Sequence, residues 1–148
     1  MRSPPACLPE TVSTAVVVAG DLNDELEATT TQLLHGPSGS EIGTGGFDLP
    51  DTGDGQRLWN LAPLILDNQR FSRVFRRRGE LIDHLLVSHV LVKAVQTVTT
   101  GAIEISSITE EPTERRDEPG SDHRTFFGEL PRDELAFSGC QWSILCQV

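Results

Sequence analysis

The chain has 148 residues, enough for one domain with a buried core, and a formal net charge of −10. This acidity argues against tight nonspecific binding to duplex nucleic acid, which requires a basic face. It does not exclude a phosphoester substrate, because a metal ion can supply positive charge locally. No apolar run approaches the roughly 20 residues of a membrane span and no signal peptide is visible, so a cytoplasmic location is the default expectation.

The first third of the chain predicts a strand, a helix and a long loop. Residues 1–14 contain prolines without periodicity, and we expect them to be an unstructured N-terminal segment. The apolar run at residues 16–19 predicts a short buried strand. Residues 24–34 predict a helix with acidic residues in its first turn and with Leu26, Leu33 and Leu34 near one apolar face. Residues 36–55 hold seven glycines and two prolines, which predicts a mobile or poorly packed loop.

The remainder of the chain predicts mainly β-structure. Five segments have the composition or alternation of strands: residues 72–75, 80–88, 90–99, 102–108 and 124–130. Thr100-Gly101 joins the third segment to the fourth, which predicts a hairpin. Residues 131–148 match nothing that precedes them and are expected to form a tail of unclear structure.

Polar residues follow the first predicted strand directly. Because a buried strand does not tolerate charge, Asp21 must lie where this strand emerges. Asp21 and Asn23 flank Leu22, so both side chains point the same way in extended backbone. A carboxylate that orients water and a carboxamide that meets phosphoryl charge would suit phosphodiester hydrolysis. The alternative is an Asx turn in which both residues cap the following helix.

A second carboxylate interrupts an apolar strand face. Asp83 needs a partner there, because an unpaired buried polar group costs several kcal/mol, and a histidine is the obvious candidate. The alternative is an edge strand whose face opens to solvent at Asp83. His84 points to the opposite face and is interpreted as a hydrogen-bonded structural histidine. His35 and His89 stand alone in the sequence and are expected to face solvent.

A third cluster, Asp122-His123, lies between a flexible loop and the last predicted strand. Neighbouring side chains in an extended chain point apart, so the two residues are expected to serve different partners. His123 could pair with Asp83, and Asp122 could contact a metal or a backbone donor. The alternative is a loop-to-strand cap.

Three motifs in this order resemble the endonuclease/exonuclease/phosphatase superfamily of deoxyribonuclease I-like, metal-dependent phosphoesterases. They are Gly20-Asp21-Leu22-Asn23, Ile82-Asp83-His84-Leu85-Leu86-Val87-Ser88 and Ser121-Asp122-His123. The resemblance covers residues 15–130 and implies an α/β (α+β) fold. That fold is a two-sheet α/β sandwich, here a truncated C-terminal half with mixed, largely antiparallel strands.

The resemblance also implies roles for the five polar residues. Asp21 would orient the attacking water, while Asn23 and His123 would stabilise the phosphoryl transition state. Asp83 would orient His123, and Asp122 would be associated with the metal, Mg²⁺ or in its place Mn²⁺. The implied substrate is a phosphodiester or phosphomonoester: nucleic acid, a nucleotide, an inositol phosphate or a phospholipid headgroup. The motifs do not choose among these.

One departure from the family pattern motivates a second hypothesis. The family's early asparagine and the glutamate that is its principal magnesium ligand have no counterpart upstream of residue 16, where Glu10 lies in no such motif. We therefore expect a C-terminal fragment that could act with a complementary N-terminal half. The second hypothesis is a catalytically incompetent fragment or pseudo-enzyme that only binds a phosphate-bearing ligand or a partner chain.

Overall fold

The computed structural model describes residues 14–49, 51–101, 121–130 and 143–147. In chain order its helices and strands are β1 (Val16–Asp21), α1 (Thr29–His35), α2 (Gly45–Asp48), β2 (Leu58–Asn60), β3 (Arg73–Phe75), β4 (Arg78–Glu80), β5 (Asp83–Ser88), α3 (His89–Val92), β6 (Thr97–Thr100), β7 (Phe126–Glu129) and β8 (Ser143–Gln147). Single 3-10 turns lie at Asp54–Gln56, Ala62–Leu64 and Asp67–Gln69. Among the described helices, none has the length and apolar character needed to cross a membrane.

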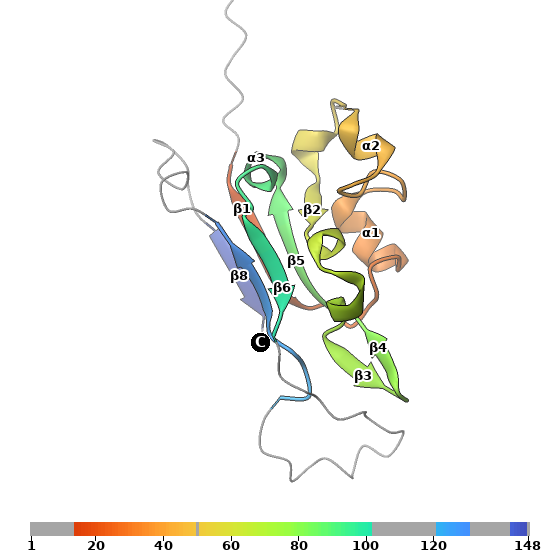
Figure 1. Cartoon of the computed structure of the whole chain (residues 1–148). Helices are drawn as coiled ribbons and strands as arrows, with labels where there is room; N and C mark the ends of the chain where they lie inside the picture. Colours follow the sequence, from red (N-terminus) through yellow and green to blue (C-terminus); the bar gives the residue numbers. More distant parts are fainter. Residues whose placement is uncertain (1–13, 50, 102–120, 131–142, 148) are drawn as a thin grey trace, which may run out of the picture.

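The main sheet has the strand order β2-β5-β1-β8 (Figure 1). Consecutive valines begin β1, and β-branched side chains of this kind pack well on a pleated surface. The strand is antiparallel to β5, with Val17 opposite Val87 and Asp21 opposite Asp83. This register brings one carboxylate from each strand to the same end of the sheet.

Two smaller sheets complete the fold, a β3–β4 hairpin and an antiparallel β6–β7 pair. The hairpin turns at Arg76 and Arg77, both with positive φ. It projects from the end of the main sheet where β1 finishes and β5 begins (Figure 1). The mixed α/β class with largely antiparallel pairing is therefore confirmed.

Several predicted strands differ in extent from the observed ones. The predicted strand 80–88 is two strands, because the chain leaves the hairpin at Glu80 and enters the main sheet at Asp83. Residues 90–99 begin with α3 instead of a strand, and only the last of them belong to β6. The predicted partner at residues 102–108 lies outside the described residues, and β6 pairs with β7.

Each predicted terminal segment is described only in part. Of the predicted unstructured segment, residues 1–14, the structure describes Thr14 alone. Within the predicted tail, residues 143–147 form β8, which pairs in parallel with β1. A strand in the tail was not expected from its sequence.

The first helix is shorter than the predicted 24–34, and its apolar face was misread. It begins at Thr29, and its buried residues are Thr31 and His35. His35 was expected to face solvent, but its Nε2 lies 3.0 Å from the Leu26 carbonyl oxygen. Leu33 and Leu34, expected on the packed face, are 83% and 37% exposed. A hydrogen-bonded turn from Glu25 to Ala28 precedes α1, so the helix starts later and presents a different face.

The long loop before β2 is better packed than its composition predicts. It contains α2, whose Phe47 ring meets Trp59 of β2 edge-on at 5.1 Å between centroids. Phe47 and Ile42 also pack against the core cluster. The buried members of that cluster are Ala15, Trp59, Leu61, Val87, Leu91 and Val92.

Replacing Phe47 by alanine tests this packing. Because the ring is only partly buried, we expect Phe47→Ala to lower the free energy of unfolding by about 1–3 kcal/mol, less than a fully buried phenylalanine. The exposed Leu49 on the same loop is the control, and Leu49→Ala should change stability by less than about 0.5 kcal/mol. Urea unfolding measures both, and equal effects of the two substitutions would contradict the packing.

Candidate active site

Three side chains from distant parts of the chain meet at one end of the main sheet. His123 Nδ1 lies 2.8 Å from Asp83 Oδ2 and 4.0 Å from Asp21 Oδ2. The side chains of His123, Asp83 and Asp21 are 20%, 19% and 35% exposed, so the group is partly shielded from water. The predicted contact between Asp83 and His123 is confirmed.

The hydrogen bond to Asp83 determines which ring nitrogen of His123 carries hydrogen. An ionised carboxylate can only accept, so Nδ1 donates to Asp83. The opposed carboxylates of Asp21 and Asp83 would repel each other, and a donor between them relieves that repulsion. The ring's Nε2 lies 3.9 Å from Asp122 Oδ1.

The backbone bends at Asp122 and His123 instead of running extended. The His123 N–H donates to Ser121 Oγ at 3.1 Å, a local turn that stabilises this bend. The bend lets Asp122 Oδ1 come to 3.9 Å from the ring of its own neighbour, which is too long for a hydrogen bond. The hydrogen bond of His123 goes to Asp83, as the sequence predicted.

Asp21 forms the Asx turn that the sequence left as an alternative, because its Oδ1 accepts the Asn23 N–H at 2.8 Å. The φ of Asn23 is 55°, a left-handed conformation that asparagine tolerates. Neither residue caps α1, which begins at Thr29 without a side-chain cap, so the capping part of that alternative was wrong. The hydrogen bond from Asn23 holds one oxygen of Asp21 while the other faces His123. Within the described part of the chain, the Asn23 carboxamide makes no hydrogen bond, so only its backbone is tied to the cluster.

Ser72 connects the two segments that supply Asp83 and His123. Its fully buried hydroxyl accepts hydrogen bonds from the N–H groups of Ile82 and Asp83, each at 3.1 Å. Its carbonyl accepts the Arg124 N–H at 2.7 Å. Sequence reasoning missed this residue, because a serine beside a short strand carries no distinguishing signal.

His84 is the centre of a second buried network. Its Nε2 donates to the Asp24 carbonyl at 2.7 Å, and its Nδ1 lies 3.0 Å from Asn60 Nδ2. Asn60 Oδ1 accepts the Ala62 N–H at 2.9 Å, which turns its NH₂ group toward the ring. Nδ1 therefore accepts, and the imidazole is neutral. The structural role predicted for His84 is confirmed, whereas Asn60 was missed.

Burial lowers the pKa of His84, because the charged ring would lose its hydration. The hydrogen bond to Asp24 and the charge of Asp83 oppose this shift in pKa but do not reverse it. The network joins the turn after β1 to β2 and β5, so it supports the backbone on which Asp21 and Asp83 stand.

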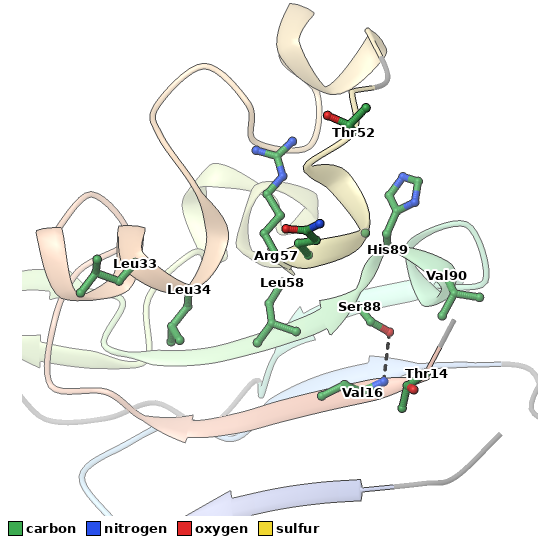
Figure 2. A pocket seen from close by; sticks show the side chains of 12 residues that line it. Thr14, Val16, Leu33, Leu34, Thr52, Arg57, Leu58, Ser88, His89 and Val90 are labelled. Atoms are coloured by element: carbon green, nitrogen blue, oxygen red, sulfur yellow. Dashed lines mark hydrogen bonds between the residues drawn. The ribbon is translucent and has the colours of Figure 1, made fainter. Parts of the chain in front are cut away.

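Two cavities lie at opposite ends of the β1–β5 pair. One of about 270 Å³ is lined by Asp83, His123 and Arg124, among others, and Asp21 lies beside it. The other, about 920 Å³, is lined by apolar and neutral residues with Arg57 and His89, and the Val16 N–H donates to Ser88 Oγ at its floor (Figure 2). Arg57 pairs with Asp54 at 2.6 Å, and within the described ranges no group of three potential metal ligands lies at the larger cavity.

The cluster has the donor chemistry of a divalent cation site. One ligand atom each from Asp21, Asp83 and His123 lies within 4.8 Å of the others. Carboxylate oxygens suit Mg²⁺ and Mn²⁺, and an imidazole is a better ligand for Mn²⁺ than for Mg²⁺. While His123 Nδ1 donates to Asp83 it cannot also bind a metal, so the carboxylates are the available ligands.

Two carboxylates and a histidine thus meet at one end of a sheet in a mixed α/β fold. The model of the endonuclease/exonuclease/phosphatase family matches residues 6–123, and the chain belongs to this family. Its members generally hydrolyse phosphoesters with a divalent metal, and the mixed α/β structure is consistent with their deoxyribonuclease I-like fold. No curated protein and no solved structure matches the chain.

The neutral state of His84 makes stability depend on pH. The unfolded chain protonates this histidine near its ordinary pKa of 6.5, but the folded chain does not, so stability is lost as the pH falls below about 6.5. We expect His84→Gln to be less stable at neutral pH and to lose less further stability between about pH 7 and 5. Thermal unfolding against pH measures this, with exposed His89→Gln as control. An unchanged slope in His84→Gln would contradict the assignment.

Proposed function

We propose that the protein is a metal-dependent phosphoesterase that hydrolyses a phosphodiester or phosphomonoester. The observation that carries this proposal is the 2.8 Å contact between His123 and Asp83, with Asp21 4.0 Å from the same nitrogen. Asp83 holds the hydrogen-bond donor His123, and the more exposed carboxylate of Asp21 lies beside it. General acid–base chemistry on a phosphoester requires such a pairing of a donor and a base.

Asp21 is proposed to orient the attacking water and accept its proton. Its Oδ1 is occupied by the Asn23 N–H, and Oδ2 remains on the side of His123. Because Asp21 ends β1, its carboxylate combines a rigid support with access to water. A fixed base of this kind removes the cost of ordering the nucleophile during the reaction.

His123 is proposed to stabilise charge on the phosphoryl oxygens through Nε2, while Asp83 holds the ring through Nδ1. This arrangement makes Asp83 a positioning residue, supported by the hydrogen bond from its own N–H to Ser72. Asn23 is proposed to add its exposed carboxamide as a second donor to the phosphoryl group, and Asp122 to associate with the metal.

The metal is proposed to be Mg²⁺, with Mn²⁺ as a substitute. When bound, it supplies positive charge to the phosphoryl oxygens and lowers the pKa of a bound water. Magnesium prefers about six oxygen ligands, and Asp21, Asp83 and Asp122 together provide too few. Water, substrate or a complementary N-terminal half would complete its shell, so we propose that the described site by itself holds the metal weakly.

Because these three carboxylates provide fewer ligands than Mg²⁺ prefers, we also propose a second candidate function. The protein could bind a phosphate-bearing ligand or partner chain without turnover, as a catalytically incompetent member of the family. Metal-dependent hydrolysis distinguishes the two functions, because the second predicts phosphate binding with no product at any metal concentration.

Substitutions at the cluster test the proposed roles. Hydrolysis of bis(p-nitrophenyl) phosphate and of a short oligonucleotide should fall about 10²–10⁴-fold in Asp21→Asn and in His123→Gln, because each loses a proton-transfer or donor group. Asp83→Asn should fall less, since His123 keeps its Nε2. Exposed His89→Gln should retain the wild-type rate, and full activity of His123→Gln would overturn the assignment.

The metal-associated role of Asp122 gives a separate prediction. We expect Asp122→Asn to raise the Mg²⁺ concentration for half-maximal activity by about 10-fold, because a charged group near the ion is lost. Exposed Glu129→Gln removes the same charge away from the cluster and should leave this concentration unchanged. Equal shifts in both variants would show a general charge effect and contradict the role.

A further inference from the structure

The positively charged side chain of Arg124 lies at the cavity that Asp83 and His123 also line. It lines that cavity, and its guanidinium carbon lies 3.9 Å from the centroid of the Phe71 ring. Its backbone N–H is bound by the Ser72 carbonyl, which fixes where the side chain departs. Both ends of the residue are therefore held by the segment that leads into β3.

Among the described residues, the guanidinium of Arg124 has no carboxylate partner of the kind that two comparable arginines have. In the described part of the chain, Arg57, Arg70 and Arg124 each have a buried Nε without a hydrogen-bond partner. Arg57 nevertheless contacts Asp54 at 2.6 Å, and Arg70 contacts Asp67 at 3.0 Å. No ion pair of Arg124 is found among the same residues. In a chain of net charge −10, an arginine in the candidate active site without a carboxylate partner among the described residues is notable.

Stacking on Phe71 determines how Arg124 can act. A guanidinium that lies over a ring keeps its N–H groups in its own plane, where they can donate in pairs to an oxyanion. The ring itself approaches β4 closely, since a Cβ added at Gly79 would lie 3.0 Å from Phe71 Cγ. Gly79 thus permits the packing that holds the ring under Arg124.

We infer that Arg124 binds a second phosphoryl group of the substrate, next to the scissile one. This inference rests on the proposed function, in which His123 contacts the scissile phosphate. His123 turns toward Asp83, whereas Arg124 turns toward Phe71 at the start of the β3–β4 hairpin. The two adjacent residues thus present donors in different directions within one cavity of about 270 Å³.

The preferred substrate class is a phosphoester with a second phosphoryl group a few bonds away. A polynucleotide backbone and a compact bisphosphate share this chemistry. A simple monophosphate lacks the oxygens that the Arg124 fork would bind.

Ligand binding tests this inference without requiring turnover. The probes are propane-1,3-diol bisphosphate, propane-1,3-diol monophosphate, and thymidine 3′,5′-bisphosphate, titrated into the full chain with Mg²⁺ by calorimetry. We expect either bisphosphate to bind at least about 10-fold more tightly than the monophosphate, as charge-assisted hydrogen bonds typically provide. In Arg124→Gln this preference should fall to about 2-fold or less.

Two further variants keep the test decisive. Arg124→Lys retains the positive charge without the planar guanidinium and should show an intermediate preference for bisphosphate over monophosphate. This variant still tests the inference if Arg124→Gln does not fold. Exposed Lys93→Gln, near α3, matches the change in net charge and should keep the full preference. An unchanged preference in both Arg124 variants, or none in the wild type, would overturn the inference.

The two bisphosphates separate the possible sources of recognition. Equal preference for both supports binding of the second phosphoryl group itself, whereas preference for the thymidine compound alone would overturn it in favour of base recognition. Absence of turnover in the wild type would count against the proposed function only, because the binding preference is measured independently of hydrolysis.

Discussion

Two carboxylates oppose each other across β1 and β5, and the candidate site is organised around them. The antiparallel register places Asp21 directly opposite Asp83, a pairing of like charges that a sheet disfavours. His123 donates to Asp83 and lies 4.0 Å from Asp21, so a residue distant in sequence relieves the repulsion. The same arrangement provides a base, a donor and candidate metal ligands at one end of a rigid sheet.

Buried polar groups hold the backbone that carries these residues. The neutral ring of His84 connects the turn after Asp21 to Asn60 on β2, and Ser72 connects the start of β5 to the segment after His123. Each contact satisfies a buried donor or acceptor that would otherwise be costly. A site supported in this way is preorganised, since its side chains need little reordering before they act.

The site could be predicted from the sequence because a charged side chain on an apolar strand face needs a partner. Asp83 on an apolar strand face required a partner, and His123 is that partner. The supporting residues could not be anticipated in the same way. Ser72 binds backbone N–H groups of β5 and its approach, and Asn60 meets the ring of His84, contacts that only folding brings about. His35 is buried by a helix that begins five residues later than its composition suggested.

The sequence by itself determined the α/β class, the strand that ends at Asp21 and the polar residues able to act on a phosphoester. Local periodicity and the cost of burying charge suffice for these features. Only the tertiary structure decided which residues meet, that the tail supplies β8, and that Arg124 stacks on Phe71 without a carboxylate partner among the described residues. These features depend on contacts between segments far apart in the chain, whose register and direction no local pattern encodes.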